Sequence, residues 1–202
     1  MYTLYYLNSA CSLAIHTVLR ELDQSVELID ITQVSNFTDI NPVGSVPVLV
    51  DGDNTLREGG AILLHLLNKH RNQMLPTSGA SREQAIQDIL FANATMHPAY
   101  GRLYFIAEHI TDTAAREAAY LAAANAINRL WQVVEQQLAG RDFLGGEQAS
   151  AADIMLAVYF RWGAGHPVSI TQGSNTTRML DAVMAMPSFQ RSVLAENTQS
   201  AA

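Results

Sequence analysis

The chain changes character partway along its length, and this change limits the folds that are open to it. Short apolar runs of strand length first alternate with helical patterns, whereas beyond the segment Asn72–Ala80 every pattern is helical. We expect strands at Tyr2–Leu7, Val26–Ile31, Val46–Val50 and Thr55–Arg57, and helices at Cys11–Leu22 and after Glu58. The crossover between the first two strands implies parallel pairing, and the turn at Asp51–Asn54 implies a hairpin.

This order of elements predicts an α/β domain followed by an all-α domain. Residues 1–73 match a thioredoxin-like βαβ–ββα unit, and residues 82–202 are expected to form an all-helical C-terminal domain. Ser81 and Gln84 resemble a capping box at the start of a helix that ends near His109 and that Pro98 should kink. Further helices are expected at Thr113–Leu138, after a second capping signature at Ser150–Asp153, near Asn175–Met186 and from Pro187 onward.

Composition excludes several classes of protein. With 49% hydrophobic and 15% charged residues, the chain can bury a sizeable core, and its net charge of -7 argues against nucleic acid as a partner. No apolar run approaches the roughly 18 residues of a membrane span, and no signal peptide is visible, so we expect no membrane partner and a cytoplasmic location. The single cysteine excludes an internal disulfide and suits a reducing compartment. The histidines are scattered without ligand spacing, so we expect no metal.

That single cysteine, Cys11, is expected at the start of the first helix, directly after a turn at Asn8–Ala10. Backbone N–H groups without intrahelical partners, together with the helix dipole, would there stabilise a thiolate and lower the pKa of the thiol. The alternative is a buried structural cysteine, because free cysteine is among the most buried residue types. Position alone gives the two interpretations equal weight.

Two other segments could contribute to a binding site. A cis Val46–Pro47 bond would leave the N–H and C=O of Val46 free for an extended peptide ligand, whereas a trans bond is the ordinary alternative. At the start of the next helix, free amides near Gly59 could bind a carboxylate, and Glu58 could accept from an ammonium group. In the alternative interpretation, Glu58 is only a favourable acid in the first turn of a helix.

The helical part offers one further candidate. His97 lies beside Pro98 and could donate to a thiolate or a carboxylate, and Asn93 should share its helix face. A helical histidine near aromatic residues is more often a packing residue, however. By the same reasoning, Tyr159 and Trp162 are expected in the core rather than against a ligand.

Together these segments resemble the glutathione transferases, most closely the cysteine-type beta class of bacteria. The resemblance extends over nearly the whole chain and rests on ordered motifs at Ala10–Ala14, His16, Leu19–Glu21, Asn41–Leu49, Arg57–Ile62 and Ser150–Asp153. It implies glutathione as co-substrate, a small electrophilic or disulfide substrate, and a homodimer. In that family the proline that corresponds to Pro47 is cis.

The resemblance also implies roles for individual residues. Cys11 would face the glutathione sulfur and form a mixed disulfide with it, and His97 would be the second catalytic residue. The glutathione-binding residues would be Val46, Pro47, Glu58, Gly59 and Asn93. The pocket for the second substrate would be lined by Tyr100, Tyr104 and Trp162.

The chain departs from the family pattern by lacking two cations. The segment between Ile31 and Asn41 is short and contains no lysine, and Pro98 stands where the family has a lysine. Each missing contact to an anionic tripeptide is worth about 1–3 kcal/mol, which predicts altered glutathione affinity unless an arginine elsewhere compensates. Two functions remain open: an enzyme whose thiol–disulfide exchange is at least comparable to its conjugation activity, and a non-catalytic ligand-binding or partner-docking protein of the same fold.

Overall fold

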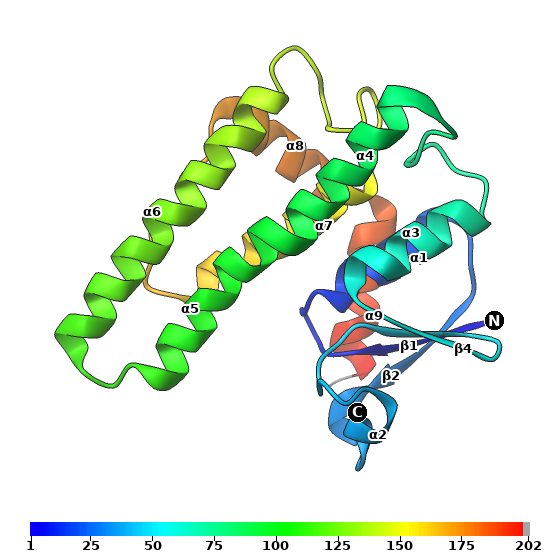
Figure 1. Ribbon diagram of the computed structural model, residues 1–202, viewed down its shortest axis with the longest axis horizontal. Helices are drawn as coiled ribbons and strands as arrows, with labels where there is room; N and C mark the ends of the chain where they lie inside the picture. The colour runs from blue at the N-terminus through cyan, green and yellow to red at the C-terminus, as the bar shows by residue number, and fades with distance from the viewer. Residues whose placement is uncertain (200–202) are drawn as a thin grey trace.

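The computed structural model describes residues 1–199, in which a small sheet lies beside a larger set of helices (Figure 1). The strands of the described part form one sheet in the order β2-β1-β3-β4, with bounds β1 (Tyr2–Tyr6), β2 (Val26–Asp30), β3 (Val48–Asp51) and β4 (Asn54–Arg57). β1 pairs parallel with β2 and antiparallel with β3, which in turn pairs antiparallel with β4. The predicted crossover and hairpin are both confirmed.

The sheet is held by apolar contacts with two helices, α1 (Ser12–Glu21) and α3 (Gly59–Lys69). Alternate residues of β1 are buried, as the two-residue period of a strand requires, so Tyr2, Leu4 and Tyr6 join the core. Between β2 and β3, the connecting segment contains two short helices, η1 (Ile31–Gln33) and α2 (Phe37–Ile40).

The remaining helices form the second part of the molecule. Their bounds are α4 (Gly79–Phe91), the π-helical turn η2 (Ala92–Met96), α5 (His97–His109), α6 (Thr113–Gln137), α7 (Ala151–Trp162), η3 (Gly163–Gly165), α8 (Ser174–Met184) and α9 (Pro187–Gln199). α7 lies at the centre, and its residues 151–159 are all buried. Within residues 1–199, no helix combines the length and apolarity needed to cross a membrane.

Three local expectations are corrected. α4 begins two residues before Ser81, with Ser78 in extended conformation as its N-cap, and Gln84 bonds Asp88 rather than reaching back, so the proposed capping box does not form. The helix that contains Pro98 is widened into a π-helical turn directly before it, which accommodates the missing N–H. β3 begins at Val48, after Pro47, because proline cannot donate into the ladder.

The second capping signature is confirmed. Ser150 Oγ accepts from the Asp153 N–H, and the Asp153 carboxylate accepts from the Ser150 N–H at 2.8 Å. The same carboxylate accepts from the Leu144 N–H at 2.9 Å, which ties the preceding loop to α7. These bonds fix the start of the helix that carries Tyr159 and Trp162 toward the sheet.

The C-terminal helix returns to the N-terminal part, where α9 packs against α1 (Figure 1). The buried carboxylate of Glu196 meets His16 Nδ1 at 3.3 Å and accepts from the Ser9 N–H at 3.3 Å. Trp162 Nε1 donates to the Ser9 carbonyl at 2.9 Å from α7. The turn before Cys11 is therefore held from two directions by the helical part of the chain.

Candidate active site

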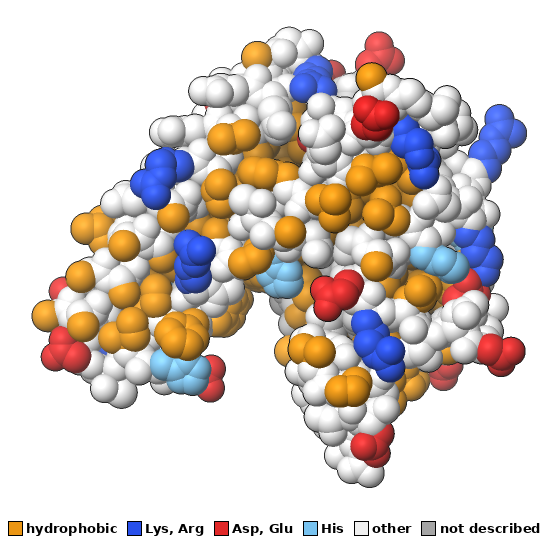
Figure 2. All heavy atoms as spheres, viewed as in Figure 1, with side chains coloured by type: hydrophobic (Ala, Val, Ile, Leu, Met, Phe, Trp, Pro, Cys, Tyr) orange, Lys and Arg blue, Asp and Glu red, His pale blue; other side chains and the backbone are white. Residues whose placement is uncertain are grey.

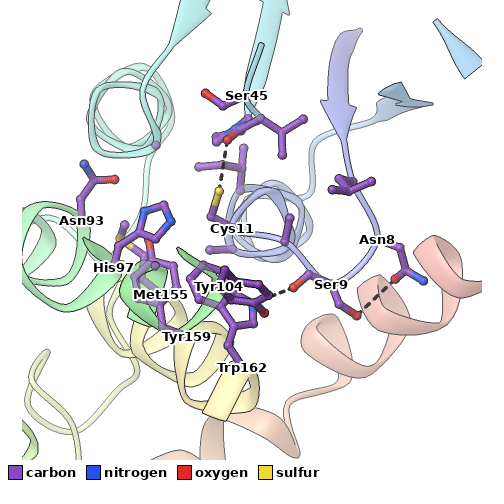
Figure 3. Close-up of a pocket in the computed structure, with 18 of the residues that line it drawn as sticks. Asn8, Ser9, Cys11, Ser45, Asn93, His97, Tyr104, Met155, Tyr159 and Trp162 are labelled. Atoms are coloured by element: carbon purple, nitrogen blue, oxygen red, sulfur yellow. Dashed lines mark hydrogen bonds between the residues drawn. The ribbon is translucent and has the colours of Figure 1, made fainter. Parts of the chain in front are cut away.

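A cavity of about 880 Å³ lies between the two parts of the molecule, where the space-filling view is deeply notched (Figure 2). Its sheet-side lining comes from the turn before α1, the β2–β3 connection and the start of α3, including Cys11, Val46, Pro47, Glu58 and Gly59. Its helical-side lining comes from η2, α5 and α7, including Asn93, His97, Tyr104, Tyr159, Arg161 and Trp162. Figure 3 shows the labelled members of this set around one space.

Cys11 lies at the N-cap of α1, as the sequence predicts. Its Sγ donates to the Val46 carbonyl at 3.2 Å, so the side chain points toward the β2–β3 connection (Figure 3). The side chain is half-buried and lines the cavity. Of the two interpretations offered by the sequence, neither is complete: the thiol packs against the core and also faces a ligand-sized space.

The expected lowering of the thiol pKa is wrong for this geometry. Burial raises the pKa of Cys11 from its ordinary 9.0 to about 11, which outweighs the lowering by the backbone N–H groups of Cys11 and Ser12. The carboxylates of Glu58 and Glu196 make smaller contributions to this rise. Cys11 does lie at a helix N-terminus, but the free-energy cost of removing a thiolate from water exceeds the stabilisation that two backbone N–H groups provide.

The Val46–Pro47 peptide bond is cis, as the resemblance implies. Its carbonyl is not free as expected, because it already accepts the hydrogen bond from the Cys11 thiol. Pro47 itself is buried, and its ring lies close to the start of α3.

The start of α3 forms a compact corner of the cavity. Glu58 is exposed at the helix N-cap with φ 69°, and Gly59 follows it as the first helical residue. Asn93 Oδ1 accepts from the Gly60 N–H at 3.1 Å, so this residue joins the helical part to α3. A Cβ on Gly59 would lie 3.0 Å from the same oxygen, so an alanine at this position would require the Asn93 side chain to shift.

The helical side of the cavity is aromatic. The His97 ring stacks on Tyr159 with centroids 4.9 Å apart and an interplanar angle of 14°, and both rings contact Trp162. Burial lowers the pKa of His97, so the ring is neutral near pH 7. His97 is therefore a packing residue that also lines the cavity, and its donation to a thiolate or a carboxylate stays a prediction.

Two of the three residues expected to line a substrate pocket line the cavity, and the third does not. Tyr104 and Trp162 line the cavity, and Tyr104 is about half exposed. Tyr100 is fully buried, its hydroxyl accepts from Trp131 Nε1 at 2.8 Å, and it is not a lining residue. Tyr100 and Tyr104 are four residues apart and share a helix face, and both rings contact Trp162, so the spacing alone could not show which of them is covered by the core.

Sequence reasoning missed three lining residues on α7, which are Met155, Tyr159 and Arg161. Met155, Tyr159 and Trp162 follow one another at helical spacing, so the lining role of Trp162 could have brought Tyr159 with it. Arg161 is the one lysine or arginine among the lining residues of the described chain. Its guanidinium lies over the Phe189 ring at 5.8 Å, and Nη1 is enclosed without a hydrogen-bond partner.

Nothing in the described part of the chain gathers three or more potential metal-ligating side chains. The chemistry available in the cavity is that of one thiol, an imidazole, a carboxylate, a guanidinium and tyrosine hydroxyls. Such a set suits a ligand that contains a sulfur atom, and it also suits a thiol–disulfide exchange reaction. Cys11 supplies one nucleophile, and the walls supply hydrogen-bond donors.

Comparison with known proteins agrees with this geometry. The model of the glutathione S-transferase N-terminal domain matches residues 6–74, and that of the C-terminal domain matches residues 91–176. The chain belongs to the glutathione S-transferase family. Its N-terminal domain is the thioredoxin-like unit and its C-terminal domain is all-helical, so the predicted fold class is confirmed.

Individual members of the glutathione S-transferase family match along their whole length. Glutathione S-transferase GST-4.5 of Xanthomonas campestris is 28% identical over 199 residues, which cover 96% of this chain and 98% of the relative. The solved glutathione S-transferase of Xylella fastidiosa is 26% identical, covers 98% of this chain and 99% of its own, and superposes with a TM-score of 0.89. A sphingomonad glutathione S-transferase, solved in complex with glutathione, is 27% identical with a TM-score of 0.83 and covers 96% and 98%.

Proposed function

We propose that the protein binds glutathione in this cavity, with the glutathione sulfur beside Cys11, and that it catalyses thiol–disulfide exchange through a mixed disulfide together with conjugation of glutathione to a small electrophile. The observation that carries the proposal is the meeting of Cys11, the cis Val46–Pro47 bond and the start of α3 on one cavity. The family and the glutathione-bound sphingomonad relative support the ligand.

The sheet side of the cavity suits the peptide part of glutathione. The backbone of Val46 would pair with the cysteinyl residue, for which its carbonyl has to release the Cys11 thiol. The γ-glutamyl carboxylate would meet the Gly59 N–H, which as the first amide of α3 has no intrahelical partner, and Glu58 would accept from the γ-glutamyl ammonium group. The Gly60 amide is already used by Asn93, so Asn93 positions this corner.

Exchange through Cys11 follows the ordinary course of thiol chemistry. The Cys11 thiol loses its proton to solvent, the thiolate attacks one sulfur of a glutathionylated disulfide, and the other sulfur leaves with the bonding electron pair. A glutathione thiolate then attacks the mixed disulfide and releases Cys11 as a thiolate. In conjugation, the thiolate of bound glutathione attacks the electrophile directly, while the helical side of the cavity holds the electrophile.

The lining arginine supports binding of an anionic ligand. The β2–β3 connection has no lysine, and Arg161 is the cation that the lining of the described chain supplies. Its Nη1 is enclosed and its guanidinium lies over Phe189, so the positive charge would act on an anionic ligand through space rather than through a hydrogen bond from that nitrogen. We also propose, from the family resemblance, that the protein belongs to the cysteine-type beta class and acts as a cytoplasmic homodimer in detoxification and redox chemistry.

Calorimetric titration with reduced glutathione tests the binding. Wild type and Cys11→Ala should both bind, because most contacts come from the backbone and from Glu58. If wild type shows no heat and no ligand-induced rise in melting temperature, the glutathione proposal is wrong.

Mass spectrometry after incubation with oxidised glutathione tests the chemistry. Wild type should gain one glutathionyl adduct on Cys11, and Cys11→Ala should gain none. Binding without an adduct and without conjugation activity would favour the second candidate, a non-catalytic ligand-binding or docking protein. The raised pKa of Cys11 is the observation that keeps this candidate in view.

A further inference from the structure

Tyr159 has a buried side chain whose hydroxyl has no partner. The residue is only 1% exposed, yet it lines the cavity, and its hydroxyl makes no hydrogen bond to any residue of the described chain. The hydroxyl is not among the fully enclosed polar atoms that lack a partner, so it opens onto the cavity. Buried tyrosine hydroxyls are ordinarily satisfied, and one left open beside a ligand-sized space indicates a donor kept for a ligand or reacting atom.

The ring that carries this hydroxyl is held in place. It stacks on His97 with centroids 4.9 Å apart and packs against Trp162 at 4.8 Å. Burial raises the pKa of Tyr159 well above 10.0, and the charge of a Cys11 thiolate raises it further. Tyr159 therefore keeps its proton at neutral pH and acts as a donor, close enough to Cys11 for the two charges to interact.

The Cys11 sulfur cannot keep its present hydrogen bond once it ionises. As a thiol it donates to the Val46 carbonyl at 3.2 Å, whereas a thiolate and a carbonyl oxygen, both electron-rich, repel each other. In Figure 3, His97 and Tyr159 lie away from that carbonyl, on the helical side of Cys11. Rotation about the Cys11 Cα–Cβ bond would carry the sulfur from the acceptor toward these donors.

The charged and titratable groups around the sulfur make such a donor necessary. Glu58 from the start of α3 and Glu196 from α9 both disfavour the thiolate. His97 from α5 is held neutral by burial, so it offers an N–H but no positive charge. α7 contributes Arg161, whose guanidinium lies over Phe189, and Tyr159, whose hydroxyl is a donor without a hydrogen-bond partner in the described chain.

We propose that Tyr159 is a catalytic residue whose hydroxyl donates a hydrogen bond to the Cys11 thiolate after the sulfur leaves the Val46 carbonyl. In the second half of the exchange, the incoming thiolate forms a bond to the glutathione sulfur of the mixed disulfide. The bond from that sulfur to Cys11 Sγ breaks, its electron pair stays on Cys11, and the resulting thiolate accepts the hydrogen bond from the Tyr159 hydroxyl. The same movement frees the Val46 carbonyl for the ligand amide. This inference rests on the proposed role of Cys11 as an exchanging thiol.

The test compares Tyr159→Phe with a matched Tyr120→Phe, which also removes the hydroxyl of a buried tyrosine but lies outside this cavity. The rate of Cys11 alkylation by iodoacetamide is measured between pH 7 and 9.5 without glutathione. Because a hydrogen bond to a charged group shifts a pKa by about one unit, Tyr159→Phe should react roughly ten-fold more slowly at pH 8. Tyr120→Phe should match wild type. Equal rates for Tyr159→Phe and wild type would overturn the inference.

A second variant keeps the test decisive if Tyr159→Phe folds poorly. Site-specific 3-fluorotyrosine at position 159 preserves the shape and makes the hydroxyl a stronger donor, so alkylation at pH 8 should be faster than in wild type; an unchanged or slower rate contradicts the proposal. Because alkylation requires no glutathione, this result is separate from the calorimetric test. A protein that binds no glutathione but shows the ten-fold loss would reject the proposed function and retain the role of Tyr159 toward the thiolate.

Discussion

The two walls of the cavity are built from different kinds of group. The sheet side presents backbone atoms at Val46 and Gly59 together with one carboxylate, Glu58. The helical side presents side chains, chiefly the stacked His97 and Tyr159 with Trp162 beside them. Backbone groups are fixed by the fold and recognise a constant peptide ligand, whereas side chains can differ between relatives of the same fold and determine what reacts. Changes on the sheet side should thus alter glutathione affinity, and changes on the helical side should alter reactivity.

The largest expected effect is a loss of stability when the hydrogen bonds that support the helical wall are removed. Asp153→Ala deletes a buried carboxylate that accepts from the N–H groups of Leu144 and Ser150 and from the Ser150 hydroxyl. Their loss should lower the free energy of unfolding by about 3 kcal/mol, measured by urea denaturation. Asp142→Ala is the control, because this carboxylate is 69% exposed in its ion pair with Arg178 and should change stability by less than about 0.5 kcal/mol. Equal losses in both variants would contradict the role of the capping box.

A smaller effect is expected at the sheet wall. Gly59→Ala places a methyl 3.0 Å from Asn93 Oδ1 and presses the start of α3 away from its present position. Glutathione affinity by calorimetry should fall about ten-fold, or roughly 1.4 kcal/mol, while Cys11 alkylation stays unchanged. Ala61→Ser on α3 alters an exposed residue that does not line the cavity and should leave the affinity as it is. A loss of alkylation rate without a loss of affinity would break the proposed division between the walls.

Trp162 permits a test of the helical wall at a single hydrogen bond. Trp162→Phe removes the donor to the Ser9 carbonyl and should cost about 1 kcal/mol of stability. Trp131→Phe removes a comparable donor to Tyr100, away from the cavity. Both variants should therefore lose stability, but only Trp162→Phe should raise KM for the electrophile in steady-state assays. If the two variants raise KM equally, Trp162 has no separate contact with the substrate.

The smallest expected effect is the pH dependence due to His97. Burial holds the pKa of His97 below its ordinary 6.5, so the unfolded chain takes up this proton more readily than the folded one. Stability should fall as the pH drops through 6.5 toward the lowered folded pKa, and it should be fully present above 6.5. Urea denaturation at pH 7.5 and 5.5 should show a smaller drop in His97→Gln than in wild type. An identical drop would assign the acid sensitivity to other groups.

Local sequence patterns predicted most of the fold, because most of its elements depend on contacts between residues that are near neighbours in sequence. The strand periodicity of β1, the hairpin turn between β3 and β4, and the Ser150–Asp153 box all act within a few residues. The Ser81 expectation failed for the same reason: several residues near a helix start can serve as the cap, and the structure uses Ser78. Among site residues, Cys11, Glu58 and Gly59 were placed by motif, whereas Tyr159 was assigned to the core because burial and cavity lining were treated as exclusive.

What the sequence by itself determined is the order of elements, the helix N-terminus at Cys11 and the family to which these motifs belong. Only the tertiary structure decided the chemistry of the thiol. The balance between helix amides and burial depends on how closely the β2–β3 connection, α7 and α9 approach Cys11, and these segments are far from it in the chain. Desolvation and long-range charge depend on distances in space, so the pKa of Cys11 and the open hydroxyl of Tyr159 could be found only there.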